Sequence, residues 1–394
     1  MTSVVDTSVK HFMHTMAAAP VLSGTAGAMI AVLDACLVNG FDIKVATSLV
    51  VASGVATLSF AGSHSATVDS VVLVEGVTGP LTALNGEQKV TAIGAGVVKF
   101  ATAAADGTAA GTISFKMAPA GWAKVFSGTN LAVYQSLDPI STKMFLRVDD
   151  TGTTSCRVRG YETMTDVSTG AGPFPTDAQI SGGGWLVKSS AAGAAVVKYA
   201  LIADARSVLL NYVPYNGSYP TSVAGGTVFF GDIIAHKPSG DKYAFTLGTA
   251  TSAGAGNALG TCDQGQQASQ YYPRSHLATG SSVVETVRAL SGGQSISGMD
   301  ATNGAFPGAI DGSLSLAAIG TSSTLNAPLR GKLPGIYQVL HSNVGAAIAP
   351  MSIVKGTGAL AGRSLLALGL GGSSTTYPST GLGISLADIT GPWR

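Results

Sequence analysis

The fold class follows from residues 143–161, which are KMFLRVDDTGTTSCRVRGY. Apolar and polar side chains alternate on both sides of a turn at 150–152. A period of two on each side of a turn predicts a β-hairpin with one face against a core. We expect Gly152 to supply the positive φ angle that such a loop needs. On the polar face, Arg147 and Asp149 should lie across from the two arginines of the second strand, so that the charges partly offset one another.

The composition indicates a β-rich protein with few charged groups. The chain has 394 residues, of which 11% are charged and 52 are glycine; the usual charged share is roughly 25%. Charged side chains commonly guard edge strands against pairing with other chains, so their scarcity predicts that other subunits cover the edges. The net charge is +1. Because no basic stripe occurs, we expect no nucleic-acid partner.

The cysteines and the apolar runs bear on compartment and membrane contact. Cys36, Cys156 and Cys262 are odd in number and far apart, which predicts a protein made in a reducing cytoplasm. The N-terminal residues lack the basic and apolar regions of a secretory signal. The uncharged runs 45–68 and 364–387 are broken by glycine and serine, so we expect no membrane span.

We predict a mainly β chain in three parts. Residues 1–44 form an N-terminal arm and helix, residues 45–118 a small all-β module with turns every eight to twelve residues or so, and residues 119–394 a larger antiparallel β-sandwich-like domain with long Gly/Ser/Thr-rich loops. The helix should span residues 23–40, with Ser23 or Thr25 as its cap.

Several side chains are expected in the interior. Cys36 lies on the apolar stripe of the predicted helix, so we interpret it as a core residue. Residues 208–210 are a continuous apolar run within a second predicted hairpin, and such a run belongs in the middle of a layered core. Trp122 and Phe126 should pack the small module against the larger domain. We also predict that Trp393 is buried against its own β domain or a neighbouring subunit.

Part of the small module resembles a β-module found in many structural proteins of tailed bacteriophages. The matching stretch is TSLVVASGVATLSFAGSHSATVDSVVLVEGVTGPLTALNGEQKVTAI, with matching points at 74–76 and 84–86. Further along, LAVYQS with the hairpin that follows it, FGDIIAHKPSGDKYAF at 230–245 and the end GRSLLAL…LADITGPWR resemble a family of uncharacterised virion structural proteins of tailed bacteriophages.

This resemblance implies a tail, baseplate or tail-tip component of the virion, assembled in the host bacterial cytoplasm. Its partners would be copies of itself and other virion proteins, with a host surface glycan as a further candidate. The family brings no active site. Asp232 and Asp241 in the GD…GD segment could form a carboxylate pair, but we interpret them as turn residues that accept local hydrogen bonds.

No catalytic pattern stands out, so we predict no enzyme activity and no catalytic, cofactor-binding or metal-binding residues. The chain lacks a G-x-S-x-G elbow, a P-loop and zinc-type spacing of Cys and His. His11 and His14 lack further nearby ligands and are interpreted as part of an extended or helical arm. The 21 acidic residues are scattered, and the sequence does not place any two of them together across a cleft, as the glycosidase chemistry of a depolymerase would require.

Two alternatives to a tail or baseplate subunit stay open. One is a receptor-binding or glycan-binding module at the tail tip, with exposed aromatic residues as its contacts; these would be Trp185, Tyr271, Tyr272 and Tyr377. The other is a capsid decoration or collar protein, which the sequence does not distinguish from a tail subunit.

Overall fold

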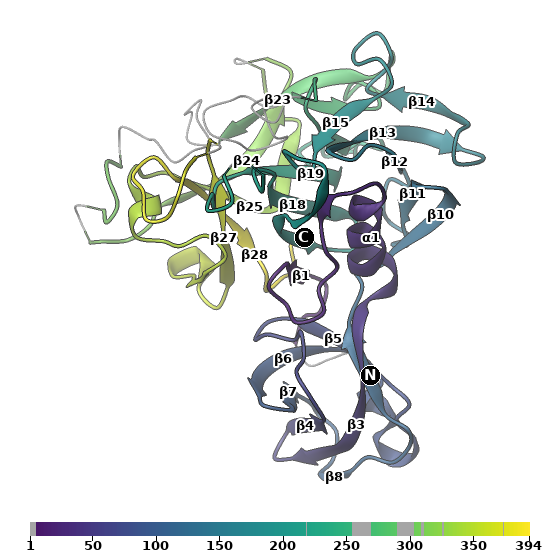
Figure 1. Ribbon diagram of the computed structural model, residues 1–394, viewed down its shortest axis with the longest axis vertical. Helices are drawn as coiled ribbons and strands as arrows, with labels where there is room; N and C mark the ends of the chain where they lie inside the picture. The colour runs from purple at the N-terminus through teal and green to yellow at the C-terminus, as the bar shows by residue number, and fades with distance from the viewer. Residues whose placement is uncertain are drawn as a thin grey trace.

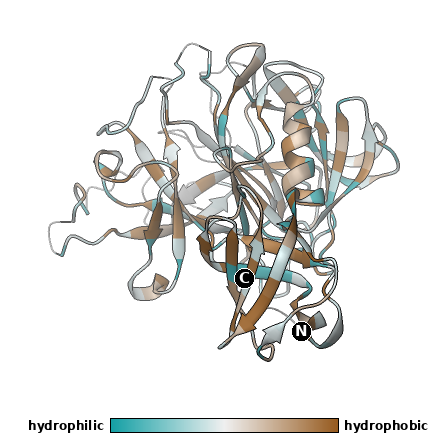
Figure 2. Cartoon of the chain, turned by 60° about the horizontal axis from the view of Figure 1, so that its bottom comes forward, coloured by the Kyte–Doolittle hydropathy of each residue, from teal (hydrophilic) through white to brown (hydrophobic). Residues whose placement is uncertain are grey.

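The computed structural model describes residues 5–217, 219–253, 269–289, 303–308, 311–324, 327–372 and 374–394. Within them the chain is mainly β, as predicted, with a short α-helix and a barrel that projects from a larger body of packed sheets (Figure 1). Strands that cross the middle of the molecule are mostly hydrophobic, whereas the loops are more polar (Figure 2). The predicted Gly/Ser/Thr-rich loops lie partly outside the described residues.

The small all-β module is a closed six-stranded barrel. Its strands follow the ring order β3–β4–β7–β6–β5–β9, and β9 pairs back with β3. Their bounds are β3 Phe41–Ala52, β4 Val55–Phe60, β5 Val71–Glu75, β6 Gly86–Gly94, β7 Val97–Ala101 and β9 Ser114–Met117; β8 (Gly107–Thr108) pairs with β3, and a 3₁₀-helix covers Gly79–Leu84. Leu58, Val98 and Phe100 alternate with more exposed residues and fill the interior.

A bulge in β3 changes which side chains of the strand face solvent. The register with β4 shifts between Ala46 and Ser48. Beyond this point Leu49 and Val51 face the barrel interior, whereas Ile43 and Val45 before it face outward. An extra residue in one strand moves its alternation to the other face, and this leaves branched aliphatic side chains on the outer wall.

The hairpin predicted at residues 143–161, which we call the central hairpin, lies in a six-stranded sheet. Its strands are β10 Trp122–Gly128, β11 Leu131–Ser136, β12 Phe145–Asp149, β13 Ser155–Met164, β14 Gly170–Phe174 and β15 Gly184–Val187. Pairing of Val148 with Val158 confirms the predicted hairpin. The expectation for Gly152 is wrong, because its φ is not positive. A Cβ there would lie 2.4 Å from the Ser155 carbonyl oxygen, so close backbone approach explains the glycine.

The larger sheet has thirteen strands and curls back on itself. A parallel bridge joins Gly225, just before β19, to Leu370 at the end of β27. The strands are β1 Lys10–Met13, β17 Lys198–Ala203, β18 Ser207–Val213, β19 Gly226–Asp232, β20 Ile234–Ala235, β21 Phe245–Gly248, β22 Ser269–Tyr272, β23 Val283–Ala289, β24 Leu316–Ser322, β25 Gly331–Val339, β26 Ile353–Lys355, β27 Ser364–Leu370 and β28 Gly383–Asp388. The predicted run 208–210 is fully buried in β18.

The remaining short elements flank these sheets. Strands β2 (Ser23–Gly24) and β16 (Gly193–Val196) pair with each other, and 3₁₀-helices cover Val344–Ala346 and Gly358–Leu360. The six-stranded and thirteen-stranded sheets share one core, in which Trp122 of β10 packs edge-on against Phe230 of β19 at 5.9 Å between ring centroids. The larger domain is therefore sandwich-like, as predicted.

The predicted helix is shorter than the sequence pattern suggested. Helix α1 covers Ala28–Leu33 and continues as a π-helix, η1, over Asp34–Asn39. Neither Ser23 nor Thr25 caps it. The carboxylate of Asp150, from the turn of the central hairpin, instead accepts hydrogen bonds from the backbone N–H groups of Met29 (2.7 Å) and Ile30 (3.2 Å).

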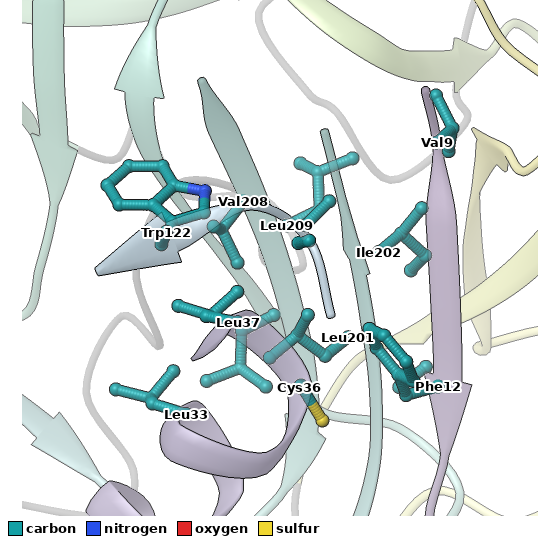
Figure 3. Close-up of a cluster of buried hydrophobic side chains, with 14 of the residues drawn as sticks. Val9, Phe12, Leu33, Cys36, Leu37, Trp122, Leu201, Ile202, Val208 and Leu209 are labelled. Atoms are coloured by element: carbon teal, nitrogen blue, oxygen red, sulfur yellow. The ribbon is translucent and has the colours of Figure 1, made fainter. Parts of the chain in front are cut away.

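The helix packs on the large sheet at the main core. Leu33, Cys36 and Leu37 face β17 and β18, with Trp122 on one side and Phe12 of β1 on the other (Figure 3). This confirms Cys36 as a core residue. Phe126 was placed wrongly, because it joins a separate small cluster with Val133, Tyr161 and Met164. Trp393 is buried, and its indole N–H donates to the Asp388 carbonyl at 2.9 Å.

Candidate functional site

The aromatic residues proposed as surface contacts do not form a platform. Tyr271 and Tyr272 are buried in β22, so the expectation that they are exposed is wrong. Trp185 is half-buried, and the guanidinium of Arg157 lies 3.8 Å from its ring centroid. Tyr377 is exposed. Burial removes two of the four residues from any direct role in binding a glycan.

The register of the central hairpin places Arg147 and Asp149 across from Arg159 and Arg157, as expected, but the ion pairs are made with other partners. Asp149 lies across from Arg157 in the register, but its carboxylate is nearest Arg147, at 3.5 Å. Arg159 pairs with Asp177 at 2.6 Å. The hairpin is thus part of the framework, and its polar face is used to hold neighbouring loops.

A polar cavity of about 620 Å³ lies where three loops of the larger domain meet. The first loop joins β11 to β12, the second joins β20 to β21, and the third joins β22 to β23. Its lining residues are Ile140, Ser141, Thr142, Lys237, Ser239, Gly240, Asp241, Lys242, His276 and Ala278. A volume of this size is within the range of small-ligand sites.

The first loop is fixed by two buried or partly buried aspartates. Thr142 donates to Asp232 through both its backbone N–H (3.0 Å) and its hydroxyl (2.5 Å). Ile140 donates its N–H to the Asp138 side chain at 2.9 Å, and Arg206 pairs with Asp138 at 3.3 Å. Burial raises the pKa of the Asp232 carboxyl, against the opposing effect of the Thr142 hydrogen bonds.

The second loop consists of two successive turns. Gly240, with φ of 81°, donates its N–H to the Lys237 carbonyl at 2.9 Å. The Asp241 side chain then accepts the N–H of Tyr243 at 3.0 Å, which closes an Asx turn. These turns bring Lys237 and Lys242 to the same cavity although they are five residues apart.

A buried arginine joins the second and third loops. Arg330 pairs with Asp241 at 2.8 Å and with Glu285 at 3.2 Å. Its guanidinium also donates to the carbonyls of Arg274 (2.9 Å) and Tyr243 (3.0 Å). Since Arg330 is almost fully buried, these bonds hold both loops to the sheet whether or not a ligand is present.

The electrostatic balance of the cavity is positive. Lys237 and Lys242 outnumber the acidic lining residue, Asp241, whose carboxylate is paired with Arg330. Lys237 donates to the His276 carbonyl at 3.2 Å, and the Lys242 ammonium lies 5.0 Å from the Tyr243 ring centroid. Among the residues that the structure describes, neither lysine has a carboxylate within ion-pair distance. The arrangement can therefore bind an anion.

Three large apolar side chains on the first and third loops are exposed. Ile140 is 73% exposed, and Leu277, between two lining residues, is 67% exposed. Leu137, three residues before Ile140, is 63% exposed. Exposed apolar side chains that gather near a cavity often belong to a contact surface.

Asp232 and Asp241 do not act as a free carboxylate pair. Each already holds a loop, Asp232 through Thr142 and Asp241 through Arg330. The turn interpretation is confirmed for Asp241, whereas Asp232 accepts hydrogen bonds from a loop ninety residues away in the sequence. The sequence singled out the right segment, but not the Arg330 that organises it.

The histidines of the N-terminal arm are not part of this site. Strand β1 carries His11, which is buried at the junction with the barrel and contacts the Thr67 hydroxyl at 3.1 Å. Across the described ranges, no three His, Cys, Asp or Glu side chains are grouped to hold a metal ion. Nor is any helix in those ranges long and apolar enough to cross a membrane. No protein-family model and no curated protein matches the chain.

Proposed function

We propose that this chain is a structural subunit of a tailed-phage virion, in the tail, baseplate or tail tip. It would assemble in the host bacterial cytoplasm with copies of itself and with other virion proteins. The resemblance of its β-module and of three further segments supports this proposal. So does the scarcity of charge, which weakens repulsion between copies. A collar or head-decoration position is the alternative within the same class.

The observation that carries the proposal is the row of aliphatic side chains on the outer wall of the barrel. Ile43 and Val45 are 69% and 65% exposed and project from the same face of β3. The bulge that follows them turns the next apolar residues inward. Burying one such side chain contributes roughly 1.5–3 kcal/mol, so a partner that covers both gains a few kcal/mol.

The closed ring of the barrel leaves fewer open strand edges than the composition suggested. The barrel has closed its ring, and the large sheet curls until β27 bridges to β19. Edge strand β10 carries a bulge between Lys124 and Phe126, which disrupts a regular edge. The ends of the larger sheets, at β1 and β26 and at β14, remain open. The barrel offers a partner the side chains of its wall, and we place the principal subunit contact there.

Sedimentation velocity of the purified chain tests this proposal. We expect concentration-dependent association of the wild type, and dissociation to monomers when Ile43→Lys and Val45→Lys are combined. Ile93→Lys is the matched control, because Ile93 is 46% exposed on β6, three strands away around the barrel. Mass spectrometry of purified phage particles should detect the chain. A wild type that stays monomeric at tens of micromolar and is absent from particles would overturn the proposal.

A further inference from the structure

We propose that the cavity formed by the three loops binds an acidic saccharide, meaning a polyhydroxylated ligand that carries a carboxylate or a phosphate. This binding site does not depend on the assembly proposed above. It involves the larger domain alone, whereas the proposed subunit contact uses the barrel wall.

The two lysines would bind the acidic group of the ligand. Lys237 and Lys242 extend from opposite ends of one double turn and line the same cavity. In the described part of the chain neither has an ion-pair partner, so their charge is available to an incoming oxyanion. Hydrogen bonds between an ammonium and an oxyanion are shorter and about twice as strong as neutral ones.

The hydroxyl groups of Ser141 and Thr142 would bind the rest of the ligand. Ser141 already donates its hydroxyl proton to the Asp138 carbonyl at 2.9 Å, and Thr142 donates its own to Asp232. With its proton committed, each oxygen can serve a ligand only as a hydrogen-bond acceptor. Their complement is a ligand that donates several O–H groups, as a sugar does. An anion without O–H groups would leave these acceptors unused.

The exposed apolar side chains near the cavity suit the same ligand class. Sugar rings present C–H faces between their hydroxyl groups, and Ile140 and Leu277 offer exposed methyl groups beside the polar lining. An acidic peptide would present few hydroxyl groups to the acceptor oxygens of Ser141 and Thr142, which favours a saccharide over a peptide.

The site is formed before any ligand arrives. Asp232 fixes the first loop, and Arg330 fixes the second and third. Groups that are already held lose little freedom on binding, which favours affinity. We therefore expect the preformed cationic cavity to bind its ligand without rearrangement of the backbone.

Isothermal titration calorimetry on the full chain tests the inference. The probes are a trisaccharide of hexuronic acid, a phosphorylated monosaccharide, the neutral counterparts of both, and a tetrapeptide of glutamate. We expect one or both acidic saccharides to bind at least tenfold more tightly than the neutral forms, with an affinity that falls as salt is added. The two acidic probes distinguish a carboxylated from a phosphorylated ligand.

The variant that tests the site combines Lys237→Ala and Lys242→Ala. Its affinity for the acidic saccharide should fall at least tenfold, which corresponds to about 1.4 kcal/mol. Combining Lys99→Ala with Lys332→Ala removes two exposed lysines outside the cavity and is the control for net charge; it should bind like the wild type. Circular dichroism checks that both variants are folded.

Three outcomes would overturn the inference. The wild type could fail to bind either acidic saccharide at millimolar concentration. The two double variants could lose affinity equally, which would show a nonspecific effect of charge. Finally, the glutamate tetrapeptide could bind more tightly than the saccharides, which would make this a protein-docking site. None of these outcomes affects the sedimentation test of the barrel wall.

Discussion

Replacing Asp150 with alanine is expected to destabilise the protein more than almost any other single change. The Asp150 carboxylate and the Lys188 ammonium form an ion pair in which both side chains are completely buried. Removing one partner of a buried pair leaves an uncompensated charge and costs about 3–5 kcal/mol. Loss of the acceptor for the first N–H groups of α1 adds about 1 kcal/mol. The total is about 4–6 kcal/mol.

The value is large because three parts of the fold meet at this carboxylate. Asp150 belongs to the turn of the central hairpin and caps helix α1 through Met29 and Ile30. Lys188 also donates to the Thr25 carbonyl at 2.6 Å, just before the helix. Burial raises the pKa of Asp150, against the opposing effect of Lys188. The pair therefore joins the six-stranded sheet to the helix.

The assay is urea unfolding followed by circular dichroism and tryptophan fluorescence, with Asp150→Ala, Lys188→Met and the double variant. The double variant leaves no unpaired charge, so it should be more stable than Asp150→Ala alone. Asp150→Asn keeps an oxygen for the helix and separates the capping contribution. A loss below about 1 kcal/mol for Asp150→Ala, or additive losses in the double variant, would refute the reasoning.

Three further predictions concern the arm, the C-terminal segment and the cavity. Burial and the nearby Lys89 lower the pKa of His11 to about 3. Below its ordinary pKa of 6.5, His11 binds a proton in the unfolded chain but not in the folded one, so the folded state loses stability as the pH falls. Between pH 6.5 and 5, the free energy of unfolding of the wild type should fall by about 2 kcal/mol relative to that of His11→Gln. Urea titrations at the two pH values measure this difference. Trp393→Ala should lower the free energy of unfolding by about 3–5 kcal/mol. Tyr377→Ala, at a 40% exposed site, should lower it by less than about 1 kcal/mol. Equal thermal midpoints of the two variants would contradict this prediction. Arg330→Met should increase hydrogen exchange at 237–244 and 274–278, and protection equal to wild type in both segments would show that Arg330 does not hold them.

The sequence predicted the features that depend on neighbouring residues. The hairpin at 143–161 follows from alternation over a few positions, and the burial of 208–210 follows from an unbroken apolar run. The helix was placed correctly at its end, where Gly40 takes a positive φ of 71°. Its start was not, because the capping carboxylate of Asp150 is more than a hundred residues away in the chain.

The candidate site could be predicted only in part, because long-range contacts build it. The segment at 230–245 stood out, but Arg330 contacts Asp241 across 89 positions, and Thr142 contacts Asp232 across 90. No local pattern marks such pairs. Tyr271 and Tyr272 have polar neighbours and were expected at the surface. They are buried because β22 lies between other strands of the curled sheet, where both faces can be covered.

The sheet closure changes how the low charge should be interpreted. Few charged residues predicted open strand edges that other subunits must cover. The barrel closes its own ring, whereas β1 and β26 still end the large sheet and β10 and β14 end the six-stranded sheet. On the barrel, association is therefore favoured by exposed side chains, of which Ile43 and Val45 are the most exposed large apolar ones. Lysine at these two positions leaves every strand pair in place, so a loss of association there would identify side-chain burial, and not strand addition, as the basis of assembly.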